Sequence, residues 1–304
     1  MIGMGRFGVI VVAIGCACGN VALAVTPILE FNYTNGSSAN TGSGSQTASA
    51  VSPGVVVASG GLDGTGSYQN HDTPNDGVNF QVQPGRFGGV GLDDNLRSIT
   101  VTMWVKADVP FINGPNSNVN LFNAGGFSMT ARPVPAGSGQ FGVSTGNSTQ
   151  PVILFDKTVA STPDFGAGDI GEWRFIALTL DMVYDSGSLT TFSTVHLYRG
   201  SLTDPVALWG TGTRSDSGDD TTEFNNLFAV GNFRIGSNFS TQQQFLGEMD
   251  DVRFYGSGSA GEAALGLNDL ENIRAAAIPE PGTALLVVIG LTALGLPLRH
   301  LRRR

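Results

Sequence analysis

The sequence predicts an all-β fold, and its composition and patterning lead to that prediction. Charged residues make up only 13% of the 304 residues, where about 25% is usual, and 43 residues are glycine. Long helices favour Lys, Glu, Arg and Ala, so this composition suits them poorly. Apolar or alternating runs are short and are separated by Gly, Asn, Asp and Pro, as strands joined by polar turns require. The 41% of hydrophobic residues is enough for a substantial core.

The strand candidates combine β-branched and aromatic residues with flanking turn residues. In chain order they are residues 28–33, 54–58, 98–106, 120–122, 126–131, 140–144, 152–156, 173–181, 193–198, 207–209, 227–230 and 247–255. Three polar stretches are expected to be surface loops, at residues 36–50, 68–77 and 214–222. The sequence has no internal repeat and no long linker in this region, so we expect one domain over residues 25–277.

A short helix is expected after the last strand. Ser259 and Glu262 have the spacing of a capping box, in which a hydroxyl and a carboxylate satisfy two backbone amides at a helix start. Leu267, Leu270 and Ile273 then recur every three residues. We therefore predict a helix that packs through these three side chains against the β domain.

Residues 1–24 have the pattern of an export signal. Arg6 precedes a mostly apolar run, and Ala22-Leu23-Ala24 offers a cleavage site that would leave Val25 as the new N-terminus. The alternative is a lipoprotein acylated at Cys16 or Cys18, although the residues before them match that pattern poorly. Both cysteines of the chain lie in this segment, so the exported domain would have no disulfide and no cysteine zinc site.

The C-terminal residues 278–304 form a second targeting segment. Pro279-Glu280-Pro281 precedes an apolar run over residues 284–298, and the chain closes on Arg302-Arg303-Arg304. Fifteen helical residues span roughly 22 Å against a hydrocarbon core of about 30 Å, which makes a marginal transmembrane helix. The terminal arginines are expected to stay in the cytoplasm by the positive-inside rule.

This segment closely resembles the PEP-CTERM sorting tail, which consists of a Pro-Glu-Pro motif, a short transmembrane helix and a basic cluster. The resemblance implies processing near the motif by an exosortase-type membrane protease, followed by release or surface attachment. It also implies a Gram-negative host that makes exopolysaccharide. The alternative is an ordinary C-terminal anchor with an accidental proline-rich entry.

Five segments of the body resemble the LamG-like, concanavalin A-like jelly roll in the right order. Residues 62–68 look like its early strand and turn, and residues 99–106 look like its Trp-containing strand. Residues 172–181 with 195–200 look like its central hairpin, and residues 245–255 look like its closing strand. The resemblance implies an antiparallel sandwich of two sheets. The family mostly binds sugars or proteins, often with one calcium ion, and some members are glycosidases.

The charge of the body argues against a nucleic-acid partner. All 25 acidic residues lie between Glu30 and Glu280, a span that holds 11 of the 16 basic residues and has a formal charge of −14. Such a surface would be repelled by a phosphate backbone. We therefore exclude nucleic acid.

Two acidic groups are candidates for a structural calcium site, because calcium takes six to eight oxygen ligands, commonly from loops. Asp216, Asp219 and Asp220 crowd one Gly-containing segment, and the jelly-roll resemblance implies Asp250 on the closing strand as a ligand. The alternative is that the first group is a solvated turn and that Asp250 caps a neighbouring backbone.

The sequence favours a non-enzymatic protein. Glu248-Met249-Asp250 begins the carboxylate pattern of jelly-roll glycosidases, but Val252 and Arg253 occupy the places of the second glutamate, so the acid/base partner is missing. The exported body would hold two histidines and no cysteine, and the chain has no Gly-x-Ser-x-Gly motif.

Three tryptophans could contact a sugar ring. Trp104 and Trp173 lie in apolar strands and are expected in the core, whereas Trp209 precedes a polar segment and is the best candidate for an exposed ligand contact.

Our hypothesis is an exported cell-surface or extracellular-matrix protein that binds polysaccharide or another envelope protein. The alternatives are a structural matrix component without a defined ligand, and a glycoside hydrolase with a degenerate motif.

Overall fold

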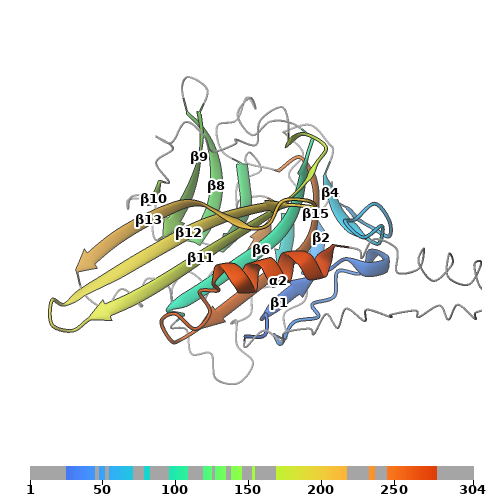
Figure 1. The fold of residues 1–304 in the computed structure, drawn as a ribbon. Helices are drawn as coiled ribbons and strands as arrows, with labels where there is room; N and C mark the ends of the chain where they lie inside the picture. The colour runs from blue at the N-terminus through green and yellow to red at the C-terminus, as the bar shows by residue number, and fades with distance from the viewer. Residues whose placement is uncertain are drawn as a thin grey trace, which may run out of the picture.

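The computed structural model describes residues 25–44, 48–51, 55–70, 79–82, 96–108, 119–124, 127–134, 138–145, 153–154, 169–217, 233–236 and 245–278. These residues form two antiparallel β-sheets, a short 3-10 turn η1 (Thr34–Gly36) and one α-helix, α2 (Leu267–Ala277) (Figure 1). The all-β, antiparallel fold class and the short helix after the last strand are therefore confirmed.

The larger sheet contains eight strands of the described chain. They are β1 (Leu29–Phe31), β3 (Val55–Val57), β4 (Ser67–Asn70), β6 (Ser98–Ala107), β11 (Trp173–Asp185), β12 (Thr190–Ser201), β13 (Ala207–Ser217) and β15 (Gly247–Ser257). Their order is β13-β12-β11-β6-β15-β4-β3, and β1 pairs with β15 outside this path. The chain-distant strands β6 and β15 are neighbours at its centre, so this sheet joins segments from both halves of the domain.

The smaller sheet contains seven strands of the described chain. They are β2 (Ala48–Val51), β5 (Asn79–Val82), β7 (Val119–Ala124), β8 (Phe127–Val134), β9 (Ser138–Thr145), β10 (Ile153–Leu154) and β14 (Phe233–Ile235). Their order is β10-β9-β8-β7-β14-β5-β2. The first four form consecutive antiparallel pairs, and β14 connects them to β5 and β2.

The main hydrophobic core contains side chains from both sheets. In β6, alternate residues contribute to it, because successive side chains of a strand point to opposite faces. The fully buried residues that β6 supplies are Ile99, Val101, Met103 and Val105, and those from the smaller sheet include Leu121, Phe122 and Ile235. The face of the larger sheet that carries these β6 residues is called the inner face below.

Helix α2 covers the outer face of the larger sheet (Figure 1). A second core lies under it, where Leu270 and Ile273 pack in one buried cluster with Trp104, Phe175 and Tyr198. Trp104 has no exposed surface and its ring makes an edge-on contact with Phe175 at a centroid distance of 5.5 Å. The prediction that Trp104 belongs to the core is confirmed. Trp173 is half-buried and packs at the margin of the same cluster.

Two buried hydroxyls of β6 hold the segment before α2 against the sheet. Thr100 donates to the carbonyl of Ala263 at 2.6 Å and accepts from the amide of Leu265 at 3.0 Å. Ser98 donates to the carbonyl of Ser259 and accepts from the amide of Ala263 at 2.8 Å. The segment before α2 is neither helix nor strand, so its buried backbone groups need other hydrogen-bond partners. The hydroxyls of Ser98 and Thr100 supply them.

The predicted start of the helix is wrong. Helix α2 begins at Leu267 with Gly266 as N-cap and without a side-chain cap, and Glu262 instead accepts a hydrogen bond from the hydroxyl of Ser257. Leu270 and Ile273 are buried as predicted, but Leu267 is 46% exposed. At 3.6 residues per turn, a step of three residues falls about 60° short of a full turn around the helix axis. Leu267, Leu270 and Ile273 therefore do not all lie on one face of α2.

Most predicted strands are confirmed, and the errors concern short or polar ones. Strands β2, β5 and β14 were not predicted, and β4 and the end of β13 fall in segments predicted as loops. The apolar alternation within these segments is weak, and each is stabilised by pairing with a neighbouring strand. The pairing of β13 with β12, for example, continues to the pair Thr190–Ser217. The predicted strand at 227–230 lies outside the described residues.

Candidate functional site

Alternation along β11 and β12 places two arginines on the inner face of the larger sheet. On β11, Ile176 belongs to the main core and Arg174 precedes it by two residues. On β12, Leu197 belongs to that core and Arg199 follows it by two residues. In the antiparallel register Arg174 pairs with Ser201 and Ile176 pairs with Arg199. The two arginines are therefore diagonal neighbours at the end of the apolar core.

A β-bulge brings Trp209 to the same place. Leu197 pairs with Gly210 and Tyr198 pairs with Leu208, so Trp209 is the extra residue of β13. Trp209 is half-buried and packs against the main core, and the guanidinium carbon of Arg199 lies 5.5 Å from the centroid of its ring. This distance is within the range of a cation–π contact, which fixes the indole and the guanidinium relative to each other.

Asp169 joins the two arginines. One oxygen, Oδ1, accepts from Nε of Arg174 at 2.7 Å and also from Nη2 of Arg199. The exposed fractions of the three side chains are 8% for Asp169, 17% for Arg174 and 13% for Arg199. Because all three charges are largely removed from water, these two ion pairs offset part of the free-energy cost of burying them.

The turn between β12 and β13 is fixed by hydrogen bonds on both of its sides. The hydroxyl of Ser201 donates to Asp204 Oδ2 at 2.8 Å and accepts from the Asp204 amide at 2.8 Å. On the side of α2, Arg274 donates to the carbonyl of Ser201 at 2.6 Å, and Glu271 accepts from the amide of Val206 at 2.8 Å. Helix α2 therefore holds the turn in position.

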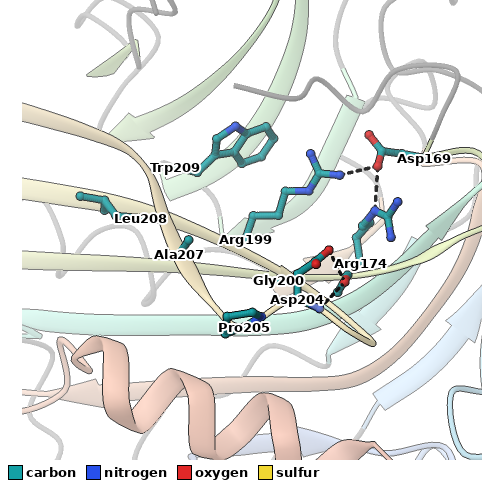
Figure 2. A pocket seen from close by; sticks show the side chains of 10 residues that line it. Asp169, Arg174, Arg199, Gly200, Asp204, Pro205, Ala207, Leu208 and Trp209 are labelled. Carbon is teal, nitrogen blue, oxygen red and sulfur yellow. Dashed lines mark hydrogen bonds and ion pairs between the residues drawn. The ribbon is translucent and has the colours of Figure 1, made fainter. Parts of the chain in front are cut away.

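These elements enclose a pocket of about 530 Å³ (Figure 2). Figure 2 shows the guanidinium of Arg199 between the indole of Trp209 and the carboxylate of Asp169, to which Arg174 is also joined. The β12–β13 turn forms a further wall through Ser201, Asp204 and Pro205. The volume is within the usual range of about 300–1,000 Å³ for small-ligand sites, and an aromatic face lies beside several hydrogen-bonding groups.

Burial and like charge both act on Arg199. Burial lowers the pKa of its guanidinium, the neighbouring Asp169 opposes that effect, and the positive charge of Arg174 lowers the pKa further. Burial is the largest of these effects, because removal from water disfavours the charged form of the guanidinium.

The structure shows what sequence reasoning found and missed here. Trp209 lines the pocket, but as a half-buried residue at a bulge rather than as an exposed strand residue. Arg174, Arg199 and Asp169 were not predicted. A signal for the arginines was present, because alternation from the apolar residues of strands 173–181 and 193–198 places both charges at inward-facing positions.

Asp250 and Asp251 lie at a second irregularity, on the closing strand β15. Its pairing with β6 shifts between Asp250 and Arg253, and Asp251 has a φ of 45°. Asp250 accepts from the Leu62 amide at 2.8 Å and from the Asp251 amide at 2.7 Å. Burial, the largest effect, raises the pKa of Asp250 to about 7 although these two hydrogen bonds oppose it.

The surroundings of Asp250 bear on the calcium prediction. Asp251 Oδ1 accepts from Arg253 at 2.8 Å, while its Oδ2 is buried and has no hydrogen-bond partner among the described residues. A small cavity is lined by Asp63, Asp250 and Asp251. In the described part of the chain, however, no three His, Cys, Asp or Glu side chains group as metal ligands. A calcium ion beside Asp250 would therefore need backbone carbonyls or water for most of its oxygens.

The other predicted calcium ligands are Asp216, Asp219 and Asp220, and the structure describes the backbone of the first, on a strand that three others separate from β15. Asp216 pairs with Thr191 near the end of β13, and Asp219 and Asp220 lie outside the described residues.

Glu248, the residue considered for a glycosidase, has its carboxylate engaged. It is 7% exposed and accepts from Lys106 at 2.8 Å, from Gln69 at 3.1 Å and from Ser67 at 3.3 Å. Met249 beside it is in the main core, so Glu248 points to the opposite, outer face of the sheet. It does not face the pocket of Trp209.

The predicted sorting residues Pro279, Glu280 and Pro281 lie outside the described residues, as does Ala24. Val25 is the first described residue and packs at the margin of the core under α2. Within the ranges that the structure describes, no helix is long and apolar enough to cross a membrane.

No protein-family model matches the chain, and no curated protein matches it in sequence. Among solved structures, it is similar to the binding domain of Paraclostridial Mosquitocidal Protein 1, with 12% identity, a TM-score of 0.46, and coverage of 81% of this chain and 51% of that one. The binding domain of botulinum neurotoxin serotype D/C gives 11% identity, a TM-score of 0.45, and coverage of 83% and 52%. A heptameric SAP-like pentraxin from Limulus polyphemus gives 13% identity, a TM-score of 0.28, and coverage of 58% of this chain and 69% of that one.

The chain thus spans about half the length of the first two structures.

Proposed function

We propose that this protein is an exported cell-surface or extracellular-matrix protein that binds polysaccharide in the pocket of Trp209, Arg199 and Arg174. The observation that carries the proposal is the pairing of a half-buried indole with two guanidiniums in an open pocket on the larger sheet. An aromatic face packs on the C–H face of a sugar ring, while planar donors bind its oxygens. The jelly-roll resemblance of the sequence supports the same class of ligand.

The direct test is the affinity of the full-length chain, purified in mild detergent, for the exopolysaccharide of its own host. In Trp209→Ala the dissociation constant should rise by about 5- to 10-fold, because an aromatic contact contributes roughly 1 kcal/mol beyond the area it buries. Phe192→Ala is a matched control, since Phe192 is 47% exposed and lies on β12 away from the pocket. Unchanged binding in Trp209→Ala would refute this site.

The export route remains part of the proposal and rests on the two terminal segments. We propose cleavage between Ala24 and Val25, and sorting by an exosortase-type protease that acts near Pro279-Glu280-Pro281 after membrane insertion of the C-terminal helix. The host would then be a Gram-negative bacterium. Intact mass of the mature protein should show both ends removed, and replacing the three motif residues with alanine should cause the full-length tail to accumulate. A wild-type protein that keeps Arg304 would contradict sorting.

We also propose one structural calcium ion beside Asp250, supported by the buried, unpartnered oxygen of Asp251 and by the oxygen-rich surroundings. A ligand that binds only the folded state raises its stability in proportion to the logarithm of its concentration. The unfolding temperature should therefore rise with calcium in the wild type and lose this dependence in Asp250→Asn. If Asp216→Asn loses it instead, the ion belongs to the end of β13.

Two alternatives correspond to defined outcomes. A structural matrix component would show no measurable affinity for any polysaccharide. A glycoside hydrolase would release reducing sugar, and Glu248→Gln would abolish that activity. The hydrogen bonds of Glu248 to three neighbours on the outer face favour a structural role for this carboxylate.

A further inference from the structure

We propose that calcium fastens the C-terminal end of helix α2 to the β domain, an inference that rests on the calcium ion proposed above beside Asp250. The cavity at that place has a volume of about 170 Å³. Its walls include Asp63 from the loop before β4, Asp250 and Asp251 from the irregular part of β15, and the last two residues of α2, Ala276 and Ala277. An ion in this cavity would therefore join segments that are distant in the sequence.

One buried carboxylate oxygen of this cavity points to a ligand. Asp251 is only 6% exposed, and its Oδ1 accepts from Arg253 at 2.8 Å. Its Oδ2 is buried and has no hydrogen-bond partner among the described residues. A buried acceptor without a partner has lost its hydrogen bonds to water and gained none in exchange, which costs free energy. A cation that binds Oδ2 would remove this cost.

The charged groups that line the cavity also favour a cation. Three are carboxylates, those of Asp63, Asp250 and Asp251, and one is the guanidinium of Arg253. Arg253 is itself shared, since its Nε lies 2.8 Å from Asp251 Oδ1 and 3.1 Å from Glu30 Oε1. Asp250 is 4% exposed, and it accepts from two backbone amides but forms no ion pair among the described residues. A divalent cation would compensate these buried negative charges.

The end of α2 can supply oxygens that the carboxylates do not. The last four carbonyls of an α-helix have no partner within the helix, and this end carries a partial negative charge. In α2 the carbonyl of Ala275 accepts from the Ile278 amide, and the next two residues, Ala276 and Ala277, line the cavity. Calcium binds six to eight oxygens and accepts backbone carbonyls among them. An ion bound to Asp251 and Asp63 would therefore also attract the carbonyls at the end of α2.

The position of the cavity along the chain gives this attachment a consequence. Ile278 follows the helix and packs at the margin of the core under α2, and Pro279, the first residue of the proposed sorting motif, is bonded to it. Calcium would therefore hold the segment that leads to the motif against the β domain. Removal of calcium would release the last turn of α2 and make this segment more accessible.

The test measures amide hydrogen exchange by mass spectrometry on the full-length chain in mild detergent, with calcium chloride or with a chelator. If opening of the helix end breaks the site, calcium should slow exchange in residues 274–278 by one plus the ratio of its concentration to its dissociation constant. At a tenfold excess over that constant the slowing is about tenfold. Exchange in residues 185–190, at the turn between β11 and β12, should not change, because this turn does not line the cavity.

Asp63→Asn removes one proposed ligand with little change to the fold. Asp63 is exposed, and its Oδ1 accepts from the Thr65 amide at 2.8 Å, which an asparagine oxygen can also do. The effect of calcium on exchange in residues 274–278 should fall towards one in this variant. Asp185→Asn is the matched control, because it removes the same charge and Asp185 Oδ1 likewise accepts from the amide two residues later, that of Gly187, at 2.9 Å.

The coupling can also be measured from the side of the helix. Coupling between two sites is reciprocal, so a substitution that loosens α2 must weaken calcium binding. Leu270→Ala removes a fully buried contact of α2 and should raise the calcium dissociation constant, measured by titration calorimetry, by about fivefold or more. Leu267→Ala, at a position that is 46% exposed, should leave the constant unchanged. Urea unfolding of each variant checks that the fold persists.

The outcomes separate the coupling from the ion itself. If calcium binds and raises the unfolding temperature but does not slow exchange in residues 274–278, the ion stands and its attachment of α2 is refuted. If calcium neither binds nor changes the unfolding temperature, the proposed ion is wrong and the inference falls with it. Equal calcium dissociation constants in Leu270→Ala and Leu267→Ala, or slowing retained in full by Asp63→Asn, would also refute the attachment described here.

Discussion

Replacing Leu270 with alanine tests how α2 is attached to the β domain. Leu270 has no exposed surface and lies in the cluster with Trp104 and Phe175. The change removes three carbon atoms, and at about 0.8 kcal/mol for each the lost burial amounts to roughly 2.4 kcal/mol. The cavity adds to this, so the free energy of unfolding should fall by about 2.5–4 kcal/mol.

Leu267 provides a control on the same helix. It is 46% exposed, and Leu267→Ala should therefore lower the free energy of unfolding by less than about 1 kcal/mol. Urea unfolding monitored by tryptophan fluorescence measures both changes, because the buried ring of Trp104 contacts the cluster under α2. The slope of the unfolding free energy against urea should stay the same, so the difference should appear in the midpoint.

Equal losses in Leu267→Ala and Leu270→Ala would refute the docking geometry described for α2. The same experiment bears on the pocket, because Arg274 and Glu271 of this helix hold the turn at Ser201 and Val206. Folded Leu270→Ala protein is therefore expected to bind polysaccharide more weakly than Leu267→Ala protein does.

Three further predictions concern stability. Thr100→Val should lower the free energy of unfolding by about 1–3 kcal/mol, measured by urea unfolding, because it leaves a buried carbonyl and a buried amide without partners. Gly61→Ala should lower the yield of folded protein and its unfolding temperature, since a Cβ there would clash with a backbone carbonyl and lie 2.6 Å from Asp250 Oδ2. Hydrogen bonds from Arg274 hold the pKa of Glu271 below its usual value of 4.5. The ionised carboxylate therefore stabilises the folded protein above that pH, and this stabilisation is lost as the pH falls through the lower folded-state pKa. Glu271→Gln should remove this acid-dependent part of a pH titration of stability.

The comparison of sequence and structure is clearest at β6 and β11. Their long apolar runs and their turn residues predicted strands at nearly the observed bounds, because alternation and β-branched side chains are local properties of the chain. The short strands β5 and β14 escaped prediction, because their hydrogen bonds come from partners distant in the sequence. The same reason explains why the end of β13 was predicted as a loop, since this polar segment is a strand because it pairs with β12.

By itself, the sequence determined the antiparallel β class, the existence of a helix after the last strand and the core role of Trp104. These depend on composition and on periodicity within one segment. The pocket was decided by tertiary structure. Its charges come from Asp169, Arg174 and Arg199, and Trp209 reaches them because a bulge shifts the register of β13. Register and bulges arise from pairing between strands, so no pattern within a single strand specifies which side chains meet in the pocket.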